Sequence, residues 1–158
     1  MKSKEPRSSE LMEKLNKLLA AYQVVYFNTR TSHWLIKGEN FFELHKVFEN
    51  GYNDAAIKID AIAERILTLG GTPLLSATDM LKASPVKESG GNGDQSACVS
   101  ALIKDLIELS VIENEIVELA DEEKDIVTAD LITGYLGEQQ KTTWMLSQFL
   151  SKRSSITK

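Results

Sequence analysis

The chain has 158 residues, 42% hydrophobic and 26% charged, with a formal net charge of −5. This suits one domain over 1–158 with short flexible termini at about 1–7 and 153–158. No stretch approaches the ~18–20 apolar residues of a membrane span, and the N-terminus lacks a signal-peptide core. The single Cys98 is interpreted as a packed residue. Together these features predict a cytoplasmic protein and argue against a general nucleic-acid surface.

The first half of the chain predicts two long amphipathic helices. Apolar residues recur at steps of three and four over residues 8–36, after a serine pair that offers an N-cap. Gly38 breaks this pattern. A second helix over 40–69 opens on an Asn-Phe-Phe-Glu variant of the capping box and ends at Gly-Gly-Thr-Pro. Gly51 inside it costs about 1 kcal/mol of helix propensity and weakens the case for perfect continuity.

The second half predicts a long crossover and two more helices. Proline and glycine concentrate in residues 72–94, where 76–81 suggest a short helix. Asp94 caps a third helix that ends near Ala120, and Thr128 or a neighbour begins the fourth. No segment alternates like a strand. Four long helices with one long connection, between the second and third, predict an all-α, ferritin-like four-helix bundle.

Both histidines of the chain lie beside the predicted second helix, and three acids follow at helical spacing. The five residues are His33, His45, Glu49, Asp60 and Glu64. Imidazole and carboxylate together are ligands for a transition metal such as iron or zinc. Each residue alone is more simply a solvated acid or a packed histidine. Their convergence nevertheless favours a metal site.

The spacing along the second helix indicates that one chain cannot complete this site. At ~100° per residue, Glu49, Asp60 and Glu64 lie within about 100° of His45, on one side of the helix. His45 and Asp60 are, however, about 22 Å apart along the axis, whereas ligands lie ~2 Å from their metal. Two antiparallel copies about a two-fold axis near residues 53–55 would join the two ends into two identical sites. The histidine of the first helix could reach the same site across the turn.

Longer motifs in these segments resemble the Dps family, the miniferritins. They are His33-Trp34-x-x-x-Gly38, Phe41-Phe42-x-Leu44-His45-x-x-Phe48-Glu49, Asp60-x-x-Ala63-Glu64-Arg65, Leu69-Gly70-Gly71-x-Pro73, and, near the C-terminus, Thr128-Ala129-Asp130-Leu131 with Trp144. The resemblance covers about residues 10–152. It implies a hollow dodecamer of two-fold dimers that oxidises ferrous iron, preferably with hydrogen peroxide, stores ferric mineral and protects against oxidative stress.

The resemblance also implies roles for individual residues. One subunit would supply His33, His45 and Glu49 and its partner Asp60 and Glu64, forming a di-iron site in which zinc could substitute. Trp34 resembles a tryptophan that absorbs oxidising equivalents, and the alternative is a core aromatic. Asp125 and Asp130 fall where the family places acids lining iron-entry pores. The family often has Asp where this chain has Glu49, and the longer arm could shift the second metal.

Three other functions are weighed against a ferroxidase. A DNA-condensing structural protein is disfavoured because only Lys2, Lys4 and Arg7 precede the first helix, so we expect DNA binding to be weak or absent. A redox-inactive zinc-binding shell fits the same ligands. A ferritin with its di-iron centre inside each bundle needs Glu-x-x-His pairs, whereas Arg30 and Phe42 stand three residues before the two histidines.

Overall fold

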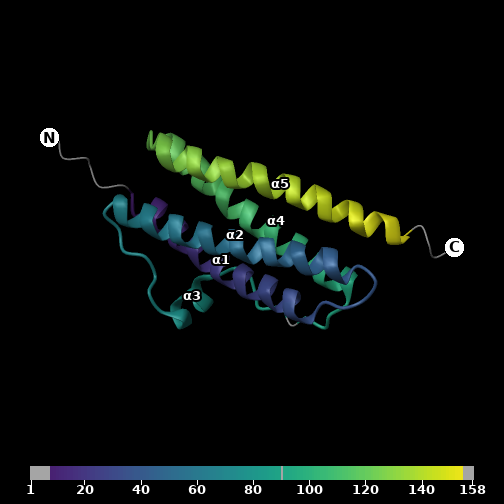
Figure 1. Cartoon of the computed structure of the whole chain (residues 1–158). Helices are drawn as coiled ribbons and strands as arrows, with labels where there is room; N and C mark the ends of the chain where they lie inside the picture. Colours follow the sequence, from purple (N-terminus) through teal and green to yellow (C-terminus); the bar gives the residue numbers. More distant parts are fainter. Residues whose placement is uncertain (1–7, 90, 155–158) are drawn as a thin grey trace.

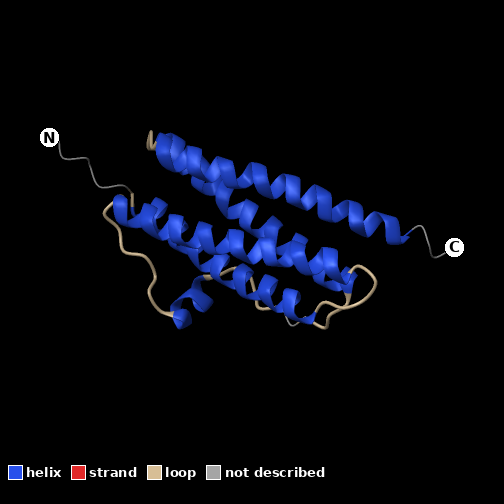
Figure 2. Ribbon diagram, in the orientation of Figure 1, coloured by secondary structure: helices blue, strands red, loops and turns tan. Residues whose placement is uncertain are grey.

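The computed structural model describes residues 8–89 and 91–154, and this part of the chain is helical (Figure 1). Its helices are α1 (Ser9–Leu35), α2 (Phe41–Thr68), α3 (Ala77–Ala83), α4 (Gln95–Glu122) and α5 (Ile126–Ser154). No strand occurs within these two ranges (Figure 2). The prediction of an all-α bundle, with one long crossover that carries a short helix, is confirmed.

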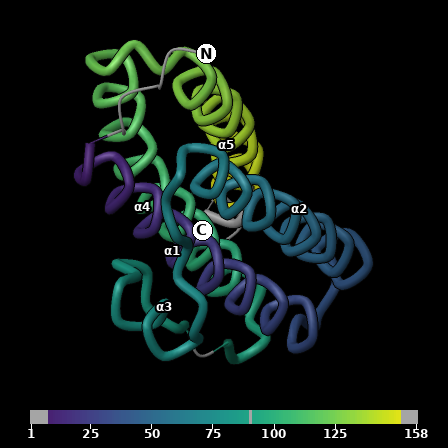
Figure 3. The backbone as a smooth tube through the Cα atoms, turned by 90° about the vertical axis from the view of Figure 1, so that its left-hand side faces the viewer, coloured from purple at the N-terminus to yellow at the C-terminus, as the bar shows by residue number. Residues whose placement is uncertain are grey.

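The four long helices lie side by side, and the crossover lies against α1. α1 packs against α2 and α4, α4 packs against α5, and α3 lies on α1. Viewed from one end, α3 lies on the far side of α1 from α5 (Figure 3), and an ion pair between Lys58 and Glu138 joins α2 to α5. The crossover carries the chain from the end of α2, past α3, back to the start of α4 (Figure 1). Within the described part, no helix is long and apolar enough to cross a membrane.

The core is built from the apolar faces that the helical spacing predicted. Cys98 is among its buried residues, which agrees with the packed interpretation. Burying each large aliphatic or aromatic side chain contributes about 1.5–3 kcal/mol. The largest fully buried apolar side chains are Phe48, Leu11, Leu15, Leu18, Leu19, Ile62, Ile66, Leu109, Ile116 and Ile132.

Helix caps follow the sequence at two of the three predicted positions. The Ser8 side chain accepts a hydrogen bond from the Leu11 amide, and Asp94 accepts one from the Ala97 amide. Asn40 precedes α2 but makes no side-chain cap, so the capping-box prediction is wrong there. Its amide nitrogen donates instead to Gln95 Oε1 at 3.0 Å, because the start of α4 lies beside that turn.

Two glycines explain how α1 and α2 come together. Gly38 has φ +114°, in the left-handed region, and the Gln95 side chain fills the space that a Cβ would need. Gly51 does not interrupt α2. A Cβ at Gly51 would lie 3.1 Å from Cγ2 of Thr29, so this glycine permits close approach of the two helices. That tertiary contact outweighs the lower helix propensity of glycine.

The fourth long helix begins near its predicted start. α5 runs from Ile126, two residues before Thr128, to Ser154. Residues 153 and 154, at the edge of the predicted flexible terminus, are the last residues of this helix. The remainder of the predicted flexible ends, 1–7 and 155–158, lies outside the described residues.

Candidate metal centre

The two histidines lie face to face, although twelve positions separate them in sequence. His33 is in the last turn of α1 and His45 in the first turns of α2. Their ring centroids are 3.8 Å apart with 24° between the planes. The turn at Gly38 brings them together by reversing the chain. Both side chains are partly buried, so they remain reachable from the surface of the chain.

Reciprocal hydrogen bonds fix the orientation of both rings. His33 Nδ1 lies 2.9 Å from the carbonyl oxygen of His45, and His45 Nδ1 lies 3.0 Å from the carbonyl oxygen of His33. A carbonyl oxygen only accepts, so each Nδ1 must carry the proton. In the neutral imidazole this leaves the lone pair on Nε2, the form that a metal-binding histidine needs. Backbone geometry therefore prepares both histidines as Nε2 ligands.

Glu49 lies on α2 one turn after His45. Its carboxylate is 2.5 Å from Lys46 Nζ, in an exposed ion pair. The hydrogen bond and the charge of Lys46 lower the pKa of Glu49. The carboxylate is thus held in its charged, ligating form. A metal at this position would have to displace Lys46, whose side chain is solvent-exposed.

Asp60 and Glu64 lie fifteen and nineteen residues beyond His45 on the unbroken α2, so they do not meet the histidines within one chain. Both side chains are exposed on the later half of α2. In the part of the chain that the structure describes, no group of three or more His, Cys, Asp or Glu side chains could hold a metal ion. Each chain therefore presents histidines at one end of α2 and free carboxylates toward the other.

Aromatic rings surround the histidine pair. Phe41 stacks on His45 at a centroid distance of 4.9 Å, and Tyr52 meets His33 edge-to-face at 5.3 Å. Tyr26 packs in turn against Tyr52 at 5.9 Å. The spacing along α2 places Tyr52 near the predicted two-fold axis, but it did not predict this contact with His33. The available signal was its position seven residues after His45, which is two helical turns along the same face.

Trp34 does not pack into the core of the chain. Its side chain is 62% exposed, which argues against the interpretation of a core aromatic at the helix end. The guanidinium carbon of Arg30 lies 5.0 Å from the Trp34 ring centroid and 4.8 Å from that of Tyr26. Arg30 is thus inserted between two aromatic rings, and this contact orients Trp34 from one helical turn away.

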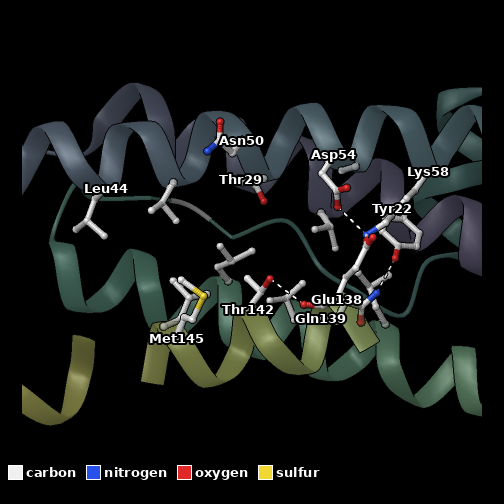
Figure 4. Close-up of a pocket in the computed structure, with 18 of the residues that line it drawn as sticks. Tyr22, Thr29, Leu44, Asn50, Asp54, Lys58, Glu138, Gln139, Thr142 and Met145 are labelled. Carbon is white, nitrogen blue, oxygen red and sulfur yellow. Dashed lines mark hydrogen bonds and ion pairs between the residues drawn. The ribbon is translucent and has the colours of Figure 1, made fainter. Parts of the chain in front are cut away.

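A lysine occupies the middle of the bundle between α2 and α5. The Lys58 ammonium lies 2.7 Å from carboxylate oxygens of both Asp54 and Glu138 (Figure 4). A cavity of about 560 Å³ extends from this polar end along apolar side chains that include Leu44 and Met145. Neither histidine lines this cavity. The cavity therefore lacks the Glu-x-x-His ligands of the di-iron centre that the sequence had already argued against.

Next to Lys58, a buried carboxylate links α1, α4 and α5. Glu113 Oε1 accepts hydrogen bonds from Tyr22 Oη and Gln139 Nε2, each at 2.7 Å. Its other oxygen, Oε2, is buried without a hydrogen-bond partner. Burial raises the pKa of Glu113 to about 7, although Tyr22 and Gln139 oppose the shift. Burial likewise raises the pKa of Asp105, on the same helix, to about 6.

The two acids predicted to line a pore lie in different environments. Asp125 is 2% exposed, pairs with Arg65 Nη2 at 2.7 Å and accepts a hydrogen bond from Thr128 Oγ1 at 2.6 Å. These contacts give it a structural role at the start of α5 and argue against a free pore carboxylate. Asp130 is exposed, and its pore role stays a prediction.

Comparisons with known proteins agree with this architecture. The ferritin-like domain family matches residues 12–156. A DNA protection during starvation protein from Porphyromonas gingivalis is 41% identical over 153 residues, covering 94% of each chain. The Dps crystal structure from Vibrio cholerae O1, a protein described as a ferritin-like diiron-carboxylate superfamily member, superposes with a TM-score of 0.87. It is 39% identical and covers 94% of this chain and 99% of that one.

A Dps structure from Staphylococcus aureus is similar in the same way, with a TM-score of 0.87, 33% identity and coverage of 92% of this chain and 97% of that one. The helical bundle with its long crossover therefore defines a ferritin-like protein. Within that class the chain belongs to the Dps family. The ferritin-like diiron-carboxylate relationship points in general to iron binding and oxidation.

Proposed function

We propose that this protein is a ferroxidase and iron store whose sites form between two-fold-related subunits. His33, His45 and Glu49 of one subunit and Asp60 and Glu64 of its partner would bind ferrous iron as substrate. The observation that supports the proposal is the separation of the paired histidines, where α1 ends and α2 begins, from the exposed carboxylates on the later half of α2.

A single two-fold axis accounts for the positions of all the α2 ligands. In an antiparallel pair of α2 helices, two residues oppose each other when they lie equally far from the axis. His45 and Glu64 share a midpoint between residues 54 and 55, and so do Glu49 and Asp60. The same symmetry operation therefore pairs histidine with carboxylate and carboxylate with carboxylate, twice in each dimer.

Exposed apolar side chains on α2 support pairing along this face. Phe42 is 82% exposed, Ile57 70% and Leu67 58%. At ~100° per residue they lie at about 60°, 120° and 40° from His45, on the side of the helix that carries the ligands. Phe42 and Leu67 also share the midpoint between residues 54 and 55. Exposed apolar surface of this kind marks a protein–protein contact, and a second copy of α2 would cover it.

The chemistry of the ligands suits paired one-electron oxidation. Neutral imidazoles and carboxylates bind ferrous iron, and the added carboxylates favour the more highly charged ferric product. Two ferrous ions would each give one electron to hydrogen peroxide, which with two protons becomes two waters. Released ferric iron would be stored as mineral within a dodecameric shell. The same ligands suit zinc, so a redox-inactive zinc-binding shell is the competing function.

Mixing two inactive variants tests shared ligation. His45→Ala and Asp60→Ala should each lose ferrous oxidation when assembled alone, since each damages both sites of a dimer. A mixed dimer has one intact site and one doubly damaged site, so co-assembly of the two should restore part of the activity. The measurement is ferric absorbance after ferrous iron with peroxide, and with oxygen to compare the oxidants.

The matched control for the mixing experiment is His45→Ala with His45→Ala,Asp60→Ala. In that mixture a mixed dimer still lacks a histidine at both sites, so no activity should return. If mixed dimers form in the first experiment and activity stays at the single-variant level, intersubunit ligation is wrong. Wild-type protein that binds the metal but oxidises no ferrous iron with either oxidant would favour the zinc-binding shell.

A further inference from the structure

Tyr52 is the phenol that touches the candidate site. Among residues 8–89 and 91–154 it is the one tyrosine whose ring contacts a site histidine, at 5.3 Å and 75° from His33. It is partly buried on α2, and Tyr26 lies behind it at 5.9 Å and 88°. These three rings form a continuous path of edge-to-face contacts from His33 on α1, through Tyr52 on α2, to Tyr26 on α1.

Arg30 makes the neighbouring aromatic rings poorer electron donors than Tyr52. Its guanidinium lies over Tyr26 and Trp34 at 4.8 and 5.0 Å from the ring centroids. A fixed cation at that distance stabilises the electrons of the ring and so opposes its one-electron oxidation. Across the described ranges no cation lies over the Tyr52 ring. Tyr52 is therefore the ring in contact with a candidate ligand that lacks a cation over its face.

We infer that Tyr52 supplies an electron to the site when only one ferrous ion is bound, an inference that rests on the proposed ferroxidase function. One ferrous ion and one phenol then each give one electron to hydrogen peroxide, and the O–O bond breaks. The phenol proton and one proton from solvent complete two waters. Ferric iron and a neutral tyrosyl radical remain, and no hydroxyl radical is released. This assigns to Tyr52 the role that the family resemblance gave to Trp34.

The test uses the assembled full-length protein, loaded without oxygen with one ferrous ion for each site and then mixed with hydrogen peroxide. Samples frozen at short times are examined by electron paramagnetic resonance, and ring-deuterated tyrosine identifies a tyrosyl signal by its altered line shape. We expect a tyrosyl signal in the wild type and its loss in Tyr52→Phe. Phenylalanine keeps the ring and its packing, so a merely structural role would leave the signal unchanged.

Two control variants make the result specific. Tyr135→Phe removes a phenol from α5, away from the histidines, and should keep the signal, as should Trp34→Phe. A tyrosyl signal that persists in Tyr52→Phe would overturn the inference. So would a signal that is insensitive to deuterated tyrosine and lost in Trp34→Phe.

Ferric absorbance measured on the same samples distinguishes a failure of the proposed role of Tyr52 from a failure of the proposed ferroxidase function. Wild-type protein that oxidises iron with peroxide without a tyrosyl signal would refute the role of Tyr52 and leave the ferroxidase standing. Wild-type protein that oxidises no iron would refute both. Zinc-loaded protein mixed with peroxide should give no signal, because zinc has no redox chemistry.

Discussion

Glu113 shows how strongly its surroundings control one side chain. It lies in the middle of α4 with no exposed surface, and one of its oxygens has no hydrogen-bond partner. Such a carboxyl group is more stable protonated, and burial accordingly raises its pKa from 4.5 to about 7. The folded protein therefore holds a proton on Glu113 at pH values where the unfolded chain has released it.

Because the folded protein binds this proton more tightly than the unfolded chain does, the free energy of unfolding falls as pH rises. The stabilisation from the bound proton is complete below the unfolded pKa near 4.5 and is lost as pH increases through about 7. A shift of this size corresponds to roughly 3 kcal/mol of unfolding free energy at most. Glu113→Gln mimics the protonated form, so it should flatten the pH dependence and raise the apparent Tm above that of the wild type at pH 8.

The measurement is a thermal unfolding series between pH 5 and 8 at constant protein concentration. Glu118→Gln, which removes an exposed acid from the same helix, is the control and should follow the wild-type curve. Asp105→Asn should remove a smaller, separate part of the dependence of Tm on pH, since the pKa of Asp105 is raised to about 6. A Glu113→Gln curve parallel to the wild type would contradict the argument.

At the scale of the helices, Asp125 joins the end of α2 to the start of α5. Arg65 Nη2 donates to its Oδ1 and Thr128 Oγ1 donates to its Oδ2. Burial alone would raise the pKa of Asp125, but these hydrogen bonds outweigh it and hold the pKa below its usual value. The carboxylate therefore both caps α5 and neutralises a largely buried arginine.

Asp125→Ala should destabilise the fold by about 3–5 kcal/mol, because it leaves Arg65 buried without its partner. Asp130→Ala changes an exposed residue and should stay within about 0.5 kcal/mol of the wild type. Urea unfolding followed by circular dichroism measures both. An Asp125→Ala protein of unchanged stability with slow iron uptake would restore the pore interpretation for this residue.

At the scale of the whole molecule, charge governs encounters with DNA. The chain carries a net charge of −5, and the basic residues of its extreme N-terminus, Lys2, Lys4 and Arg7, lie outside the described residues. A shell would present many copies of each terminus, which strengthens weak contacts through avidity. Binding through few phosphate contacts nevertheless weakens steeply with salt.

We therefore expect no retardation of plasmid DNA at about 200 mM salt and at most weak retardation at about 50 mM. A gel shift at both ionic strengths, without free divalent metal that could bridge acids to phosphates, measures this. Replacing Lys2, Lys4 and Arg7 together by Ala should abolish whatever binding appears at low salt. Retardation that persists at the higher salt would support a DNA-condensing role instead.

The sequence by itself determined the elements of this protein and the composition of its candidate site. Helical spacing of apolar residues located all four long helices, because the 3.6-residue period is a local property of the chain. The separation of His45 from Asp60 predicted that one chain cannot bring them together, and the structure keeps them apart for the same geometrical reason.

Only the tertiary structure decided which side chains meet across helices. The stacking of His33 on His45, the contact of Tyr52 with His33, and the burial of Asp125 depend on where three turns place separate helices. The sequence pattern shows which residues share a face of one helix, but it does not show which other helix or side chain contacts that face. For that reason Asn40 bonds to Gln95 instead of capping α2, and Asp125 pairs with Arg65.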